Sequence, residues 1–282
     1  MEISRRLFGK RGPAVTQVGL GGEGVLRTSG RGEQALAVIE RAAGEGIAYF
    51  DTAPAYAQSQ DYYGRFWERH PNLRSSIFQT SKSASRSYAG AKADLAGSLQ
   101  KMGLESLDLW QIHDIRTRQD IEQVEGPGGA LQAFMEAKDT GLTRYLGVTG
   151  HHDPRILLHA VQSWPVDAAL MPVNPVEASI GGFMDAVMPA ALDRGLAVIA
   201  MKVLGGSHHI SAMDGITAEL LLRFALSRQI STAVVGCKSS EEASLLAAAG
   251  REFQPLAEEE QEWLVEQFRP HARRLAYYRG VI

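Results

Sequence analysis

The 282-residue sequence contains a single cysteine, Cys237. One thiol cannot form an internal disulfide, so the chain does not rely on the covalent links that stabilise small secreted domains, and we expect the reducing cytoplasm as its location. Residues 1–12 carry arginine and lysine, but no apolar stretch follows them. A secretory signal is therefore not expected either.

Long hydrophobic runs and a strong charge of one sign are also lacking. The apolar run that begins at Leu196 has the length of a strand and is interrupted by Lys202, whereas a transmembrane helix needs about 20 such residues. Lys and Arg number 29 against 32 Asp and Glu, a formal net charge of −3. Nucleic-acid binding calls for a basic surface. We expect neither a membrane nor a nucleic acid as partner.

What the sequence does contain is an alternation of short, β-rich apolar runs with longer amphipathic stretches. A hairpin over residues 4–18, turning at 10–13, comes first. The expected strands are 18–22, 47–50, 77–81, 107–112, 144–148, 166–173, 196–201 and 232–235. The expected helices are 32–45, 59–69, 88–102, 130–138, one from Asp153, 184–194, 217–228 and 240–249, with an extra C-terminal helix at 258–268.

Eight strand–helix units in roughly 250 residues favour a closed (β/α)8 TIM barrel. No linker or change of composition interrupts them, so a single domain over residues 1–282 is predicted. A doubly wound dinucleotide-binding fold is the alternative, because residues 19–24 contain a Gly-x-Gly-x-x-Gly pattern. That fold also needs an acidic residue at a strand end about 20 residues later, which is lacking here.

Polar side chains follow three consecutive expected strands. Asp51 and Tyr56 follow the second, Lys82 the third and His113 the fourth, and a barrel places these strand ends at one face, where active sites lie. A Tyr hydroxyl, with an ordinary pKa near 10, is a poor proton donor alone, but a nearby ammonium lowers that pKa and a carboxylate can hold the ammonium. With a His to orient the substrate, the set predicts proton delivery to a carbonyl that receives hydride.

The segments that carry these residues resemble the aldo-keto reductase family, in the family's order and at comparable spacing. They are residues 50–56 (Phe-Asp-Thr-Ala-Pro-Ala-Tyr), 80–82 (Thr-Ser-Lys) and 108–113 (Asp-Leu-Trp-Gln-Ile-His). The resemblance implies that Tyr56 is the general acid for reduction, that Lys82 lowers its pKa, that Asp51 pairs with Lys82, and that His113 orients the carbonyl. The hydride would come from C4 of a nicotinamide.

The same resemblance implies a set of cofactor-binding residues. They are Gly22, Thr149, Gly150, His151, Asn174, Lys202, Leu204, Gly205, Gly236, Cys237, Lys238 and Glu242. The family usually has Ser-Asn where this chain has Thr149-Gly150, so Thr149 supplies the hydroxyl and His151 is the candidate to replace the Asn. Where the family usually has Gln after the sixth strand, this chain has Leu170, and Asn174 is the nearest polar residue.

The nucleotide preference rests on two residues of opposite charge. Lys238 can neutralise the 2′-phosphate of NADP. Glu242, where the family often has Arg or Gln, suits the free ribose hydroxyl of NAD instead. NADP, the family's usual cofactor, is the expected one, and NAD is the alternative.

We predict an NAD(P)H-dependent oxidoreductase that reduces an aldehyde, ketone or sugar carbonyl of a small molecule. Two alternatives stay open: a redox-neutral enzyme that oxidises a sugar transiently before elimination or epimerisation, and a non-catalytic nucleotide-sensing subunit. Metal binding is not predicted, because adjacent histidines such as His151 and His152 point to opposite faces of a strand and have no acidic or cysteine partner at ligand spacing. The sequence predicts no oligomeric state.

Overall fold

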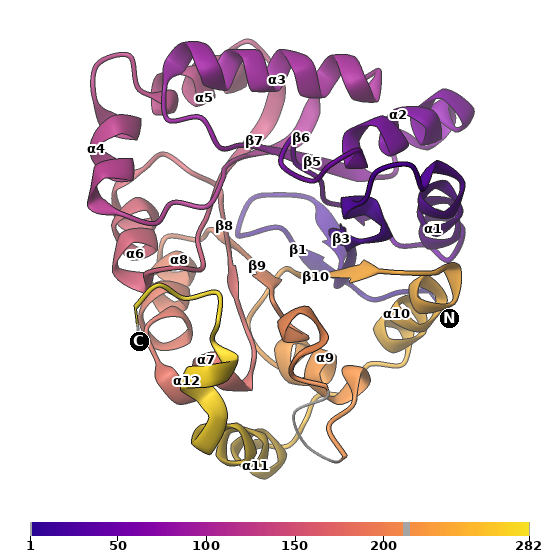
Figure 1. Cartoon of the computed structure of the whole chain (residues 1–282), viewed down its shortest axis with the longest axis vertical. Coiled ribbons are helices and arrows are strands. Elements are labelled where there is room, and N and C mark those ends of the chain that lie inside the picture. The colour runs from indigo at the N-terminus through magenta and orange to yellow at the C-terminus, as the bar shows by residue number, and fades with distance from the viewer. Residues whose placement is uncertain (1, 211–214, 282) are drawn as a thin grey trace.

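The computed structural model describes residues 2–210 and 215–281. Eight parallel strands close into a barrel in the order β10-β3-β4-β5-β6-β7-β8-β9, and helices surround it (Figure 1). The strands are β3 (Val18–Gly24), β4 (Tyr49–Phe50), β5 (Phe78–Ser83), β6 (Leu107–Ile112), β7 (Thr143–Thr149), β8 (Ala168–Pro172), β9 (Ala197–Met201) and β10 (Thr232–Cys237). The predicted (β/α)8 barrel is confirmed.

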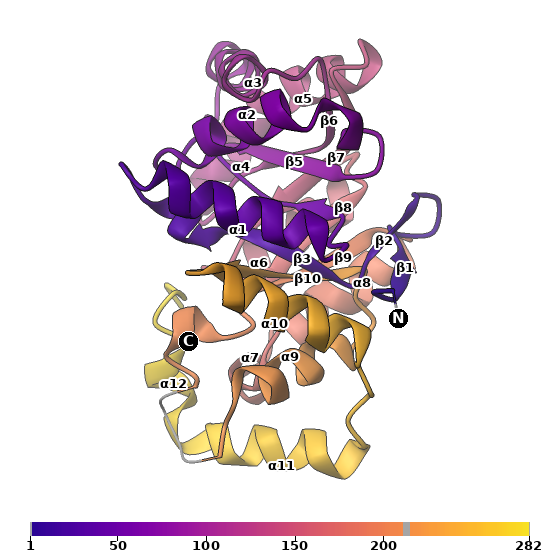
Figure 2. The same cartoon turned by 90° about the vertical axis from the view of Figure 1, so that its right-hand side faces the viewer.

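The predicted N-terminal hairpin is present as β1 (Arg5–Leu7) and β2 (Ala14–Thr16), paired antiparallel. Its turn carries Phe8, whose ring centre lies 4.8 Å from that of Phe78 and 5.4 Å from that of Tyr145. The hairpin therefore closes one end of the barrel. Figure 2 shows it on the opposite side of the molecule from the C-terminal segment.

The apolar core has three parts, two of which involve the barrel strands; the third lies around Leu221, Leu264 and Phe268. Inside the barrel, one cluster is formed by Phe8, Val15, Tyr49, Phe78, Leu109, Ala168, Leu170, Ala197 and Ile199. A larger cluster lies between the strands and the surrounding helices, where the rings of Trp110 and Phe134 stack with centres 3.6 Å apart. Side chains along each strand point alternately into the barrel and toward the helices. In the barrel interior the apolar cluster lies at the hairpin end, and the polar side chains lie at the opposite end.

The helices that pair with the strands are α1 (Gly32–Gly44), α2 (Ser59–Arg69), α3 (Tyr88–Met102), α5 (Ala130–Asp139), α6 (Pro154–Ser163), α8 (Met188–Asp193), α9 (Ala218–Leu226) and α10 (Ser240–Arg251). The extra helix α11 (Glu258–Phe268) has the predicted bounds. The sequence prediction missed α4 (Arg118–Glu125), α7 (Pro175–Ile180) and α12 (Ala272–Leu275). The single helix expected at 184–194 is instead a π-helical turn, Phe183–Val187, followed by α8.

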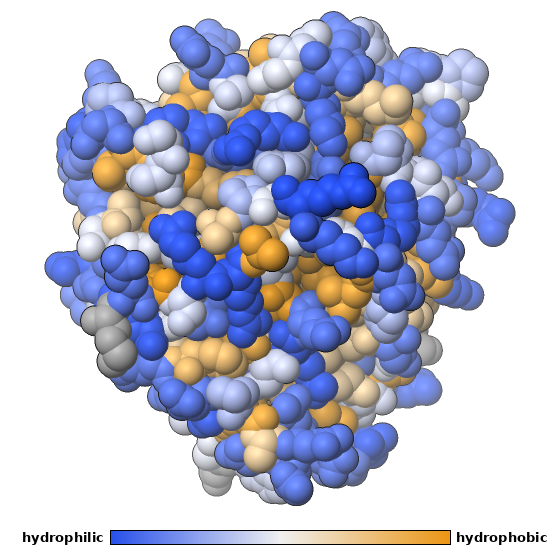
Figure 3. Space-filling view, turned by 180° about the vertical axis from the view of Figure 1, so that it is seen from behind, coloured by the Kyte–Doolittle hydropathy of each residue, from blue (hydrophilic) through white to orange (hydrophobic). Residues whose placement is uncertain are grey.

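On the face seen from behind in Figure 3, hydrophilic side chains predominate and apolar ones are scattered among them. Large exposed apolar side chains such as Leu7 and Leu245 lie on separate elements. Within residues 2–210 and 215–281, no helix has both the length and the apolar character needed to span a membrane.

Candidate active site

An ion pair between Lys82 and Asp51 lies at the centre of the barrel mouth. Lys82 Nζ is 2.6 Å from both carboxylate oxygens of Asp51 and donates to the backbone oxygen of Thr52 at 3.0 Å. Thr80 Oγ1 also donates to Asp51 Oδ1, at 2.8 Å. The side chains of Lys82 and Asp51 are 0% and 5% exposed. Burial lowers the pKa of Lys82, while the carboxylate of Asp51 works in the opposite direction.

Lys82 lies inside β5 rather than after it, because β5 continues to Ser83. The register pairs Lys82 with Gln111 of β6, so both are held by the sheet rather than by a loop. Gln111 is a site residue that the sequence prediction missed: its Nε2 lies 3.5 Å from Asp51 Oδ1, and its buried Oε1 has no hydrogen-bond partner among the described residues. Strand alternation in 107–112 was the signal for a polar side chain that faces the barrel interior.

Tyr56 and His113 stand next to this ion pair. The Tyr56 ring centre is 4.7 Å from Lys82 Nζ and 5.6 Å from the centre of the His113 ring, which is nearly perpendicular to it. Gly22 makes room for Tyr56, because a Cβ atom on Gly22 would lie 2.4 Å from Tyr56 Cδ2. All four predicted catalytic side chains therefore lie together at the barrel mouth.

The electrostatics of Tyr56 differ from the expectation. Burial raises the pKa of Tyr56 well above its usual value, and the carboxylates of Asp51 and Glu23 add to the increase. The charge of Arg27 acts in the opposite direction on this pKa, and the lowering expected from Lys82 stays a prediction. Tyr56 is therefore a protonated phenol at neutral pH.

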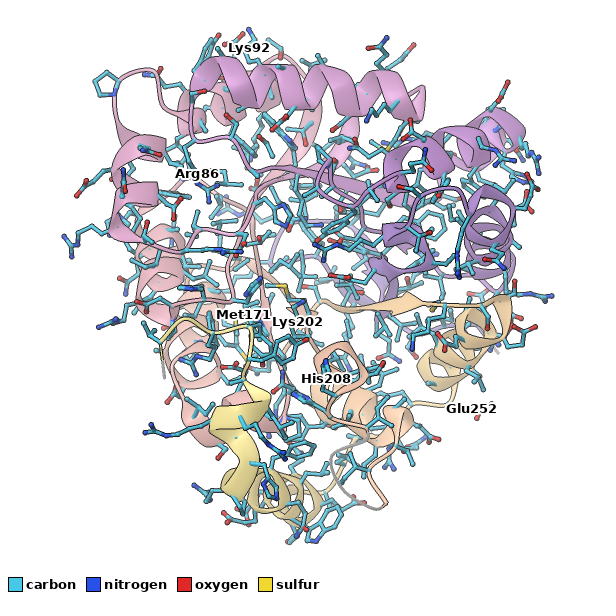
Figure 4. All side chains as sticks on the ribbon, in the orientation of Figure 1. Arg86, Lys92, Met171, Lys202, His208 and Glu252 are labelled. Carbon is cyan, nitrogen blue, oxygen red and sulfur yellow. The ribbon has the colours of Figure 1, made fainter. Side chains whose placement is uncertain are left out.

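His113 is a neutral imidazole at neutral pH. Burial, with the charge of Lys82, lowers its pKa to about 3, so it can donate or accept a hydrogen bond without carrying a charge. Its main chain is fixed: the His113 N–H donates to Ser83 O at 2.8 Å, and Arg86 Nη1 donates to His113 O at 2.8 Å. Figure 4 shows Arg86 beside α4, on its side toward the middle of the molecule.

The residues expected to bind the carboxamide of a nicotinamide make hydrogen bonds to the protein's own backbone. Thr149, the last residue of β7, accepts through Oγ1 the backbone N–H of Asp114 at 2.7 Å. The Gly150 N–H donates to Leu170 O at 3.3 Å. His151 Nδ1 lies 3.1 Å from the backbone oxygen of Tyr278, which belongs to the C-terminal segment.

Asn174 is fully buried and caps α7. Its Oδ1 accepts the N–H of Glu177 at 2.9 Å, and its Nδ2 donates to Lys202 O at 2.9 Å and to Tyr278 Oη at 3.0 Å. Both polar atoms of the amide are thus engaged in holding α7, the loop after β9 and the C-terminal segment. Contact between Asn174 and a cofactor stays a prediction.

The loop after β9 runs through unusual backbone conformations. Lys202 has a φ of 54° and Gly205 a φ of 53°, and a Cβ atom on Gly205 would meet the His209 ring at 2.3 Å. The Lys202 ammonium is 3.9 Å from Glu23 Oε1, and Figure 4 shows Lys202 near the middle of the molecule. Leu204 is half-buried on the same loop.

The loop after β10 brings together the remaining predicted residues. A Cβ atom on Gly236 would lie 2.6 Å from Glu23 Cβ. Cys237 is buried, and burial raises the pKa of its thiol to about 12, so it is not a nucleophile. Lys238 is exposed, and its backbone N–H donates to Glu242 Oε2 at 2.6 Å. The Glu242 carboxylate is therefore turned toward its own loop.

Within the part of the chain that the structure describes, no group of three or more His, Cys, Asp or Glu side chains is arranged to hold a metal ion.

The chain is similar to known proteins of one family. The model of the aldo/keto reductase family matches residues 17–212. An aldo-keto reductase of Strobilurus tenacellus is 24% identical over 205 residues, which cover 68% of this chain and 59% of that protein. An aldo-keto reductase of Mycolicibacterium vanbaalenii is 27% identical over 240 residues, covering 80% and 78%. The chain thus spans about three fifths of the Strobilurus relative.

Solved structures show the same fold. An aldo-keto reductase from Bacillus halodurans in its holo form superposes with a TM-score of 0.76 at 18% identity, covering 100% of this chain and 98% of the other. An aldo-keto reductase from Klebsiella pneumoniae in complex with NADPH has a TM-score of 0.77 at 18% identity, covering 95% and 96%.

Proposed function

Since this chain belongs to the aldo/keto reductase family, we propose that it reduces the carbonyl of an aldehyde, ketone or sugar to an alcohol with NADPH. The observation that carries the proposal is the grouping of Tyr56, His113 and the Lys82–Asp51 ion pair at one end of the barrel. The single cysteine supports a cytoplasmic location.

The four side chains divide the work of proton delivery. Burial keeps the Tyr56 hydroxyl protonated, which is the state from which it can give a proton to the carbonyl oxygen. As that proton leaves, negative charge develops on the phenol, and the ammonium of Lys82 stabilises it at short range. Neutral His113 donates a hydrogen bond to the same oxygen and orients the carbonyl. The bound nicotinamide would supply the hydride.

NADPH is favoured over NADH by the loop after β10. The exposed side chain of Lys238 can neutralise a 2′-phosphate, while the carboxylate of Glu242 is engaged by the Lys238 N–H. The Klebsiella relative was solved with NADPH, which supports the same nucleotide here. Lys202 and the glycines Gly205 and Gly236 would hold the phosphates, and Gly22 keeps Tyr56 beside the nicotinamide.

The test is a comparison of the wild-type protein with Tyr56→Phe. Titration with NADPH and separately with NADH, followed by quenching of tryptophan fluorescence, gives the cofactor and its Kd; aldehydes, ketones and sugars are then screened for oxidation of that cofactor. Tyr56→Phe should lower kcat by about 10²- to 10⁴-fold, as loss of a general acid does, and should leave the Kd of NADPH unchanged. Full activity of this variant, or binding of neither nucleotide by folded protein, contradicts the proposal.

A further inference from the structure

An exposed cation lies directly beside the proton donor. Arg27 ends the short 3-10 turn that follows β3, and its guanidinium carbon Cζ is 5.3 Å from the centre of the Tyr56 ring. The side chain of Arg27 is 48% exposed. Lys82, which also lies near this ring, is fully buried and is paired with Asp51. Arg27 is therefore a positive charge next to Tyr56 that a molecule arriving from solvent can reach.

Most of the hydrogen-bonding capacity of Arg27 is unused. Its Nη1 donates to Glu23 Oε1 at 2.7 Å, whereas Nε and Nη2 donate to no atom of residues 2–210 and 215–281. These two nitrogens form one edge of the planar guanidinium fork, the geometry that binds both oxygens of a carboxylate. The bond to Glu23 and the contact with the Tyr56 ring hold this edge in place before a ligand arrives.

Other cations at this end of the barrel are engaged by the protein or assigned to the cofactor. Arg116 donates through Nε and Nη2 to one carboxylate oxygen of Asp114. Arg86 donates through Nε, Nη1 and Nη2 to protein oxygens. Lys202 would hold the phosphates of the cofactor in the proposed function. Among these cations, Arg27 is the one that remains for the substrate.

The charge of Arg27 acts where the reaction takes place. Burial and the carboxylates of Asp51 and Glu23 raise the pKa of Tyr56, and Arg27 opposes them. Because the interaction between charges weakens with distance, this effect agrees with the short separation between the guanidinium and the phenol ring. A carbonyl group that accepts a proton from Tyr56 therefore lies close to Arg27. An anionic group on the same small molecule can reach the free edge of the guanidinium.

Glu23 limits the kind of anion that fits. Its carboxylate is 46% exposed and lies against the same guanidinium, so it repels any anion that binds there. Repulsion grows with the charge of the ligand, which makes a doubly charged phosphate monoester less favourable than a singly charged carboxylate. A carboxylate also matches the planar edge formed by Nε and Nη2 of Arg27.

We propose that the substrates of this site are aldehydes or ketones that carry a carboxylate, and that Arg27 binds this carboxylate while Tyr56 protonates the carbonyl oxygen. The inference rests on the proposed function and names the substrate class of the same site. Arg27 is then a specificity-determining residue, and Glu23 is a positioning residue that holds its guanidinium beside Tyr56.

The test compares 4-carboxybenzaldehyde with its neutral methyl ester, methyl 4-formylbenzoate. Values of kcat and KM are measured with NADPH for the wild type, Arg27→Met and the control Arg31→Met, which removes an exposed charge from the same segment. The wild type and the control should prefer the carboxylate. Arg27→Met should lower the ratio of kcat/KM, carboxylate over ester, by about 10- to 100-fold, as loss of a hydrogen bond to a charged group does. The loss should appear in the KM of the carboxylate, because Arg27 contacts a group that does not react.

Two further variants separate recognition of the carboxylate from support of Tyr56. Arg27→Lys keeps the charge but loses the fork, so its ratio should lie between those of the wild type and Arg27→Met. Glu23→Gln should raise the ratio by about 2- to 5-fold, because it removes a carboxylate that repels the substrate. Its effect on the pKa of Tyr56 is the same for both aldehydes and cancels in the ratio.

A purely structural role of Arg27 would give another result. If Arg27 only packed on the ring of Tyr56, Arg27→Met would lower kcat for both aldehydes by the same factor, and the ratio would stay unchanged. That outcome, or reduction of neutral carbonyl compounds alone by the wild type, overturns the inference and leaves the proposed function intact. If no carbonyl compound in the screen oxidises NADPH or NADH, the proposed function is overturned and this inference with it.

Discussion

The Lys82–Asp51 ion pair fixes the positions of its two side chains, but removing both charges from water costs free energy. Both groups are almost fully buried, and taking two charges out of water offsets most of their attraction, so such a pair adds little net stability. What the pair provides is geometry. Thr80 Oγ1 donates to the Asp51 carboxylate, and Lys82 Nζ donates to Thr52 O, so the ammonium is held beside the ring of Tyr56. Breaking the pair from one side is therefore costly, while removing both charges is not.

Lys82→Met should lower the free energy of unfolding by about 3–5 kcal/mol, because it leaves the Asp51 carboxylate buried without its counter-ion. The double variant Lys82→Met/Asp51→Asn should recover most of that loss, since no uncompensated charge remains. Urea denaturation of the three proteins measures both effects. A double variant as unstable as the single one would show that packing around Lys82, and not its charge, was lost.

At the scale of single residues, the sequence predicts which side chains lie together. It does not predict their pKa values or their orientation. Asp51, Tyr56, Lys82 and His113 lie at or after the ends of consecutive strands, and strand ends share one level of a barrel. The pKa of Tyr56 was not predictable, because it depends mainly on the burial of the ring, which the absence of a side chain at Gly22 permits. The approach of His151 Nε2 to within 3.4 Å of Asp114 Oδ1 was not predictable either, since His151 is oriented by the backbone oxygen of Tyr278 in the distant C-terminal segment.

Helices α2 and α3 pack against each other and offer a matched pair of glycines. A Cβ atom on Gly97 of α3 would meet nothing within 4 Å, whereas one on Gly64 of α2 would lie 2.1 Å from Lys101 O. Gly97→Ala should raise the free energy of unfolding by about 0.5–1 kcal/mol, because alanine loses less backbone entropy in a helix. Gly64→Ala should lower it. Thermal and urea unfolding of the two variants measure these changes; a gain in both would mean that α2 and α3 can separate at no cost.

Elements with strong local signals were predicted and those that depend on tertiary contacts were not. The bounds of α2, α3 and α11 agree with the sequence prediction. In α3 the end signals are local ones, because Ser87 caps its first turn and Gly103 ends it in the left-handed conformation. Helix α4 has only eight residues, most of them polar, and buries only Ile121 and Val124, so it was missed although Thr117 and Asp120 form a capping box. Helix α7 has six residues and is held by Asn174 and the C-terminal segment, which no local pattern reveals.

The whole molecule is closed by contacts between the two ends of the sequence. The last strand pairs with the first, Ala233 opposite Val18, the hairpin fills one end of the barrel, and the C-terminal segment covers part of the other. The repeating pattern predicts the number of strand–helix units and therefore the barrel. The C-terminal segment contacts His151 and Asn174 through individual hydrogen bonds between residues that are distant in the sequence. A repeating pattern does not predict such bonds.

Because the barrel is closed between its first and last strands, residues 1–282 should unfold as a single domain. Trp67, Trp110 and Trp164 are buried in different parts of the chain, and only Trp263 on α11 is largely exposed. Urea transitions followed by tryptophan fluorescence and by far-ultraviolet circular dichroism should therefore coincide in the variant Trp263→Phe, as two-state unfolding requires. The separate apolar cluster around Leu221, Leu264 and Phe268 is where cooperativity could fail. An earlier transition in circular dichroism, with the fluorescence unchanged, would show that α11 and the tail unfold independently of the barrel.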